Sequence, residues 1–175
     1  MKTILWCLLL LFSVNVVGRE EMMTKIIEAK KSSSVLTITY EINNNTKNDR
    51  WLFDSCDGKD YFLRLSEGSL IIMVRSLDVP PNIDLFVPVK TTYVLLKKGE
   101  SKKIKIDIPM MTKESCYGCK KEINLSMIKK LRIETGYVEL NEKTKKCSRQ
   151  IQEKLTLDHF CARENESIFT VHHEI

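Results

Sequence analysis

Apolar and polar residues alternate over two stretches of the chain, and this alternation predicts β-strands. Apolar residues occupy the even positions from 36 to 42, and isoleucines occupy positions 104, 106 and 108, with polar residues between them. A period of two places every second side chain on the same face of a strand, so each stretch has one face for a core. Shorter apolar runs predict further strands at residues 51–53, 61–65, 70–74, 92–96, 131–140, 154–161 and 167–174. Helix-like spacing of the apolar residues at 22, 23, 26 and 27 predicts a short helix within residues 19–31.

Turn-forming residues between these runs indicate how the strands are joined. Gly99 supplies the positive φ that a tight loop needs, so residues 92–96 and 104–108 are expected to pair as a hairpin. Residues 163–166 are expected to join the last two strands in the same way. Gly136 within a predicted strand indicates a bulge.

About nine short strands and little helix favour an all-β fold, an antiparallel two-sheet sandwich, with a closed barrel as the alternative. The strand end Tyr40-Glu41-Ile42-Asn43-Asn44, the turn Gly99-Glu100-Ser101 and the strand end at Pro109 resemble those of bacterial exported immunoglobulin-like modules. The resemblance covers residues 37–109 and implies an immunoglobulin-like fold. It implies no particular function, because this architecture serves many unrelated roles.

The first 18 residues have the composition of a secretory signal peptide. Lys2 is the only charged residue before Arg19, the region between them is apolar, and Val16-Val17-Gly18 offers small residues for cleavage. The apolar region is shorter than the roughly 20 residues of a membrane-spanning helix. We therefore expect residues 1–18 to be removed and residues 19–175 to form one extracytoplasmic domain, secreted or periplasmic, without stable membrane insertion. An uncleaved anchor is the alternative.

Charge and motifs exclude several classes of function. The formal net charge of +5 is spread over lysine pairs with acidic residues nearby, which favours a solvated surface over a nucleic-acid footprint. The chain has no Gly-x-Ser-x-Gly elbow, no phosphate-binding glycine loop and no His-Glu-x-x-His pair. The sequence therefore predicts a protein that is not an enzyme and needs no cofactor.

Five cysteines follow residue 18, and in an oxidising compartment each is a disulfide candidate: Cys56, Cys116, Cys119, Cys147 and Cys161. An odd number leaves at least one thiol unpaired. Cys116-Tyr117-Gly118-Cys119 also has the spacing of a redox motif or of half a zinc site, but no βαβ pattern surrounds it and no second Cys-x-x-Cys follows. The favoured interpretation is a structural bridge from this loop to the region of Cys147 or Cys161.

His159, His172 and Cys161 form a weaker metal candidate. If residues 163–166 close a hairpin, the two histidines lie diagonally on one sheet face with Cys161 one step along. Diagonal neighbours are roughly 7–8 Å apart, close enough to share an ion. Solvent-exposed histidines on a terminal strand are the alternative interpretation.

Together these features favour an exported, non-enzymatic β-sandwich that binds a partner protein or associates with the cell envelope. An exposed strand edge is one surface that such a protein uses for binding. The alternative hypothesis is an exported thiol-redox or metal-binding protein that acts through Cys116 and Cys119.

Overall fold

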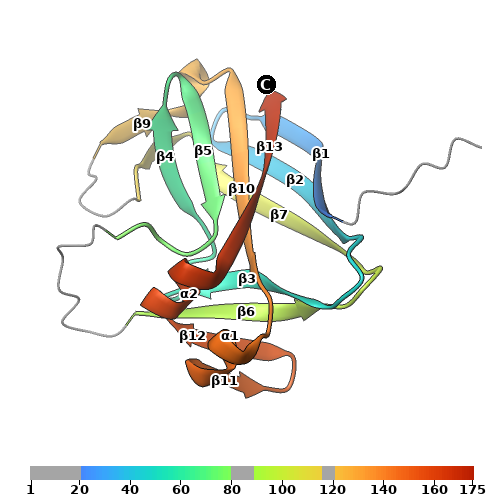
Figure 1. Ribbon diagram of the computed structural model, residues 1–175. Helices are drawn as coiled ribbons and strands as arrows, with labels where there is room; N and C mark the ends of the chain where they lie inside the picture. Colours follow the sequence, from blue (N-terminus) through green and yellow to red (C-terminus); the bar gives the residue numbers. More distant parts are fainter. Residues whose placement is uncertain (1–20, 80–88, 116–120) are drawn as a thin grey trace, which may run out of the picture.

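The computed structural model describes residues 21–79, 89–115 and 121–175 of the chain (Figure 1). These residues contain thirteen strands, two short α-helices and one 3₁₀ turn. The elements are β1 (Met22–Lys31), β2 (Val35–Asn44), β3 (Arg50–Cys56), β4 (Phe62–Ser66), β5 (Ser69–Val74), β6 (Lys90–Leu96), β7 (Ser101–Pro109), β8 (Met111–Lys113), β9 (Glu122–Asn124), η1 (Leu125–Met127), β10 (Lys130–Val138), α1 (Glu142–Lys146), β11 (Ser148–Ile151), β12 (Lys154–Asp158), α2 (His159–Asn165) and β13 (Glu166–Glu174). The prediction of an all-β fold is confirmed. The signal peptide predicted at residues 1–18 lies outside the described residues.

A small antiparallel sheet has the strand order β1-β2-β7. The apolar residues at the even positions 36–42 of β2 are 0% exposed. Ile106 and Ile108 of β7 lie opposite Ile38 and Leu36, so they share this buried face. The alternation predicted for both strands is confirmed, because one face of the sheet packs on the core and the other faces water.

The segment predicted as a helix within residues 19–31 is strand β1, so that prediction is wrong. β1 pairs with β2, and the register shifts between Ile26 and Glu28. This bulge adds one residue, Ile27, which is 47% exposed. The bulge accounts for the adjacent pair Ile26-Ile27, whereas Met22 and Met23 are in regular register, with Met22 buried and Met23 exposed.

Strand β10 organises a larger sheet of eight strands. Along one side β10 pairs antiparallel with β13; along the other, its residues 130–135 pair in parallel with β5, and Tyr137 and Val138 pair with β3. The sheet continues from β5 to β4 and from β3 through β6 and β12 to β11, while β8 and β9 form a separate pair. Figure 1 shows β13 running beside β10 across the molecule. The parallel pair and the third sheet depart from the antiparallel two-sheet expectation, and the immunoglobulin-like arrangement stays a prediction.

The predicted turn between β6 and β7 is present, but the two strands do not pair with each other. Gly99 has a φ of +77°, and the N–H of Glu100 donates to the carbonyl of Lys97 (3.0 Å). β6 pairs with β3 and β12, whereas β7 pairs with β2. The hairpin expected over residues 92–108 is therefore wrong, because the turn residues specify only the local reversal of the chain.

Asn44, at the end of β2, lies where the chain passes from one sheet to the other. Its backbone N–H donates to Glu100 (3.0 Å), and its carbonyl accepts from the N–H of Gly99 (2.8 Å). Its side-chain amide donates to the carbonyls of Leu96 and Asn48, both at 3.0 Å. Asn44 is 0% exposed, so these bonds replace hydrogen bonds to water, and they tie the end of β2 to the end of β6 and to the turn before β7.

The hairpin expected around residues 163–166 is absent as well. β12 ends at Asp158, whose carboxylate accepts from the N–H of Cys161 (2.9 Å) and caps α2. After α2 the chain crosses to β10, and β13 does not pair with β12. Aspartate is a preferred N-cap, so Asp158 was a helix signal that the apolar run from 154 to 161 concealed.

Candidate functional site

Cys147 and Cys161 form a disulfide that joins the end of α1 to α2. Cys147 is the C-cap of α1, and Cys161 lies inside α2, with a separation of 14 residues along the chain. In the chain-entropy account, closing a loop of this size stabilises the fold by about 3 kcal/mol. The prediction of disulfide bonding is confirmed for this pair.

This pairing leaves no sulfur in the C-terminal half for Cys116 or Cys119, so the bridge expected between that loop and the C-terminal half is wrong. Cys116 and Cys119 themselves lie outside the described residues. On either side of them, the N–H of Glu114 donates to the carbonyl of Lys121 (2.8 Å). The hairpin of β8 and β9 therefore brings together the two ends of the segment that carries the motif.

Cys56 is the free cysteine among the described residues and is 1% exposed. The hydroxyl of Thr91 donates to its sulfur (3.6 Å). Burial raises the pKa of the Cys56 thiol. A buried, protonated thiol is neither a nucleophile nor a metal ligand, so Cys56 belongs to the core.

The three weak metal candidates are not brought together. His159 begins α2 and is 2% exposed, Cys161 is in the disulfide, and His172 lies on β13 opposite Arg132. Burial lowers the pKa of His159, and its ring nitrogens have no hydrogen-bond partner among the described residues. Asp158 lies close to both sulfurs, but sulfurs in a disulfide lack the negative charge with which thiolates bind metal ions.

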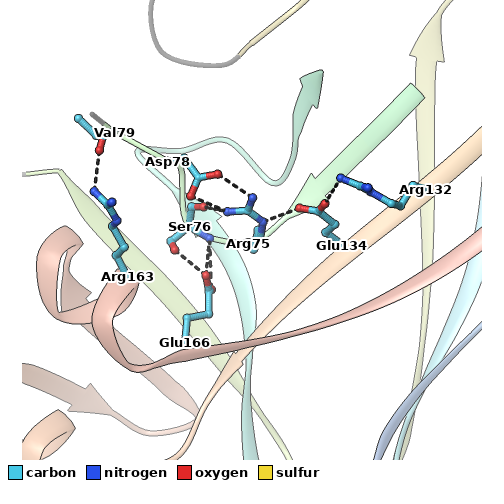
Figure 2. A network of polar contacts seen from close by, with 8 residues as sticks. All are labelled: Arg75, Ser76, Asp78, Val79, Arg132, Glu134, Arg163 and Glu166. Atoms are coloured by element: carbon cyan, nitrogen blue, oxygen red, sulfur yellow. Dashed lines mark hydrogen bonds and ion pairs between the residues drawn. The ribbon is translucent and has the colours of Figure 1, made fainter. Parts of the chain in front are cut away.

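A chain of charges that the sequence did not predict connects the segment after β5 with β10 (Figure 2). Its two central members, Arg75 and Glu134, are buried. Nε of Arg75 donates to Glu134 (2.8 Å), and its terminal nitrogens donate to Asp78 (3.0 and 2.8 Å). Glu134 also accepts from Arg132 (2.7 Å). Positive and negative side chains alternate along Asp78, Arg75, Glu134 and Arg132, so each buried charge has an opposite neighbour, as a buried charge requires.

Glu166, the first residue of β13, directs its carboxylate at the end of β5 (Figure 2). It accepts hydrogen bonds from the backbone N–H of Ser76 (3.0 Å), from the Ser76 hydroxyl and from the Tyr93 hydroxyl (3.0 Å). Burial raises the pKa of Glu166 to about 7, although these donors oppose the rise. These hydrogen bonds attach the start of β13 to the segment after β5 and to β6.

Gly136 of β10 makes room for this carboxylate. A Cβ at this position would collide with the Glu166 carboxylate and would lie 2.8 Å from Cβ of Arg75. β10 and β13 pair here without a shift in register, so the bulge predicted at Gly136 is absent. Glycine within a strand indicates either a bulge or a close approach, and here it is a close approach.

The outer edge of β7 is an open strand edge, since β7 ends the small sheet and, among the described strands, pairs with β2 alone. Its even-numbered residues direct their backbone N–H and C=O groups at β2. At one end of the pair the N–H of Met110 donates to the carbonyl of Ser34, and at the other end the carbonyl of Glu100 accepts from the N–H of Asn44. Backbone direction alternates along an antiparallel strand, so the odd-numbered residues 101–107 direct their N–H and C=O groups outward. One of these groups, the carbonyl of Asp107, accepts from the Tyr61 hydroxyl (3.4 Å).

A cleft of about 450 Å³ adjoins this edge, between the small sheet and the large one. Residues 102–107 of β7 form one side of it, and Tyr40, Phe53 and Val74, all at most 4% exposed, are among its deepest residues. Lysines 102, 103 and 105 and aspartates 54, 60 and 107 give the cleft a charged rim. The cleft thus has apolar side chains beside a row of outward-directed backbone groups, inside a charged rim.

Other strand edges within the described ranges are covered, bulged or short. At β4, the N–H of Ser115 donates to Leu63 (2.9 Å) and the Glu114 carboxylate accepts from the N–H of Leu65 (2.8 Å). β1 has its bulge at Ile27, and β11 has four residues. β13 pairs with β10 along one edge and lies against β1. β7 offers nine residues and has only its lysines as protection against pairing.

No protein-family model, no curated protein and no solved structure matches this chain. Within residues 21–79, 89–115 and 121–175, no helix is long and apolar enough to cross a membrane. Of the residues that the sequence analysis selected, Cys147 and Cys161 form a disulfide, Cys56 and His159 are buried, and His172 is exposed on a strand. The open edge of β7, in contrast, combines outward-directed backbone groups with a cleft.

Proposed function

We propose that the protein is an exported, non-enzymatic β-protein that captures an extended segment of a partner protein as an additional strand on β7. The observation that carries this proposal is the nine-residue strand with an open outer edge beside a cleft. Strand addition requires unpaired backbone groups for affinity and pockets for alternate side chains for specificity. The edge of β7 supplies both.

The backbone of β7 sets the register of such a complex. The outward N–H and C=O groups of Ser101, Lys103 and Lys105 are the ones that an incoming strand would bind. Side chains of the added strand would alternate between the two faces of the sheet. Every second residue would therefore point into the cleft toward Tyr40 and Phe53, where apolar side chains gain from leaving water.

The charges on β7 favour one kind of partner. Lys103 and Lys105 are exposed on the solvent face. Two copies of the chain joined through this edge would bring these lysines opposite each other, which disfavours self-association. A segment with acidic residues on its solvent face and apolar residues on its cleft face complements β7 best.

The competing proposal is thiol-redox or metal chemistry at Cys116 and Cys119. It finds no second reactive group among the described residues, since Cys147 is bonded to Cys161 and Cys56 is buried. Intact-mass analysis with alkylation, before and after mild reduction, tests this alternative. A Cys116–Cys119 bond reduced at the potential of a thiol-exchange enzyme would support it, and a resistant bond would reject it.

Peptide selection tests strand addition directly. A display library of nine-residue peptides is selected against the mature protein, and we expect enriched sequences in which acidic and apolar residues alternate. Bound peptide should slow hydrogen exchange at the amides of Lys103 and Lys105. Protection confined to another edge would contradict the proposal.

Lys105→Pro is the decisive variant. It removes an outward N–H while leaving the bonds between β2 and β7 in place, and proline is tolerated on strand edges. We expect the selected peptides to bind this variant at least about 10-fold more weakly, as for the loss of one or two backbone bonds. Lys105→Gln, which keeps the N–H and removes the charge, is the matched control and should lose less. Equal binding to wild type and Lys105→Pro would overturn the proposal.

A further inference from the structure

The outer face of the large sheet carries a row of basic side chains that is separate from the β7 edge. Arg64 of β4 lies opposite Ile71 of β5, Ile71 lies opposite Arg132 of β10, and Arg132 lies opposite His172 of β13. Residues opposite each other on paired strands point to the same face. Arg64, Arg132 and His172 therefore stand in line across four strands.

The guanidinium of Arg132 is held in position. It donates to Glu134 (2.7 Å), and Glu134 is in turn fixed by Arg75 (2.8 Å). Nε of Arg132 is buried and has no hydrogen-bond partner among the described residues. The charge chain of Figure 2 thus ends in an arginine whose guanidinium is held in place by Glu134.

Arg64 is the arginine of the row that has no ion pair among the described residues, although its charge acts on Asp78. Hydrogen bonds from Arg75, and to a smaller extent the charge of Arg64, lower the pKa of the Asp78 carboxyl. No ion pair or hydrogen bond of its side chain occurs within the described ranges, and its Nε is buried without a partner. Adjacent strands are about 4.8 Å apart, so the backbones of Arg64 and Arg132 are separated by roughly 10 Å across β5. Ile71 between them is 1% exposed, and arginine side chains commonly lay their stems along such apolar surface and keep the charged end in water.

A hollow of about 420 Å³ continues the row at its end. Lys130, Ser69 and His172 line it, and Ser69 lies opposite Lys130 in the parallel pair of β5 and β10. Glu174, also in the lining, lies opposite Lys130 and offsets its charge. Asp78 and Glu134 likewise offset Arg75 and Arg132, and Asp78 also offsets part of the charge of Arg64. Two carboxylates thus face three guanidinium groups, which leaves this part of the face with a positive surplus.

We propose that this face binds a phosphate group, through the terminal nitrogens of the Arg64 and Arg132 guanidinium groups with Lys130, Ser69 and His172 beside them. A guanidinium presents planar, paired donors that match a phosphate oxyanion. Two arginines roughly 10 Å apart at the backbone suit a ligand that carries two phosphate groups, or neighbouring headgroups on a surface. The same chemistry is supplied by a soluble phosphorylated molecule or by the headgroup of a phospholipid.

Inorganic pyrophosphate is the soluble probe. At about 0.15 M salt, where exposed charges are screened beyond about 8 Å, we expect it to raise the melting temperature of the wild-type protein and to shift its own ³¹P resonance. Arg64→Gln should weaken binding about 10-fold or more, the effect of losing hydrogen bonds to a charged group. Because the Arg64 side chain has no hydrogen bond or ion pair within the described ranges, and glutamine keeps part of its apolar stem, the melting temperature of this variant without pyrophosphate should stay close to that of the wild type.

Arg149→Gln is the matched control, since Arg149 is an exposed arginine on β11 and its replacement changes the net charge equally. Co-sedimentation with phosphatidylglycerol vesicles, against phosphatidylcholine vesicles, distinguishes the two sources of phosphate. Binding to the anionic vesicles that depends on Arg64 assigns a lipid headgroup, and Arg64-dependent binding of pyrophosphate alone assigns a soluble ligand. The proposal is overturned if the wild type binds neither probe, or if Arg64→Gln and Arg149→Gln behave alike.

Discussion

The carboxylate of Glu166 occupies the space that a side chain at position 136 would fill, and Gly136 is what allows it to do so. This contact joins the first residue of β13 to β10 at the point where the carboxylate also receives the hydrogen bonds of Ser76 and Tyr93. The place at which the last strand begins is therefore determined by one missing side chain.

Replacing Gly136 by alanine should destabilise the protein by about 2 kcal/mol, because the new methyl group overpacks a site with no room for it. Urea unfolding followed by circular dichroism measures the loss. In the Glu166→Ala background the same replacement should cost clearly less, since the colliding carboxylate is gone. An equal cost in both backgrounds would show that Glu166 is not the obstacle.

The stability of the protein should depend on pH through Glu166. Its pKa is raised from 4.5 to about 7, so the folded protein holds this proton more tightly than the unfolded chain. The stabilisation is complete below pH 4.5 and is lost as the pH rises through 7, at no more than about 1.4 kcal/mol per pH unit. The difference in unfolding free energy between wild type and Glu166→Gln, measured from pH 4.5 to 8, isolates this group. A difference that is flat with pH would refute the prediction.

Removal of the Cys147–Cys161 disulfide should lower the unfolding free energy by about 3 kcal/mol. The double variant Cys147→Ser/Cys161→Ser and the wild type treated with a reductant should agree in guanidinium unfolding. Reductant added to the double variant is the control and should change little further. If the reduced wild type were as stable as the oxidised protein, the bond would contribute nothing to the fold.

Replacing Asn44 by alanine should cost about 2 kcal/mol, because the carbonyl of Leu96 would lose its amide donor inside the protein. The loss can be measured in the same urea experiment. Asn45→Ala, at an exposed neighbouring position, is the matched control and should stay within about 0.5 kcal/mol of the wild type. Similar losses in both variants would remove the special role assigned to the buried amide.

Local pattern predicted the strands well, and it failed where long-range pairing decides the outcome. The alternation in β2 and β7 identifies half-buried strands because burial follows the period of two along the backbone. It does not say that β7 pairs with β2 instead of β6, because Gly99 governs only a turn. Asp158 similarly ends one strand and caps α2 within a run that is apolar enough to continue.

The candidate site was less predictable than the fold. A strand has an open edge when no other strand pairs with that side of it, and this depends on the pairing of the whole sheet. The residue types of β7, including Lys103 and Lys105, do not reveal that it lies at an edge. Glu166 and Arg64 look like ordinary surface residues until the pairing of distant strands places them. In the sequence, Gly136 alone hints at the buried network around Glu166. A glycine inside a strand indicates either a bulge or a close approach, and the prediction of a bulge is wrong.

The position of β10 between β5 and β13 has a consequence for the life of the chain. During synthesis β10 is complete well before β13, and until β13 arrives one whole side of a nine-residue strand lacks its partner. Unpaired strand edges recruit other chains, so a product truncated after α2 would be prone to aggregate even with most of its core in place. Full-length chains are therefore expected to be safest from aggregation once β13 has been synthesised and has paired with β10.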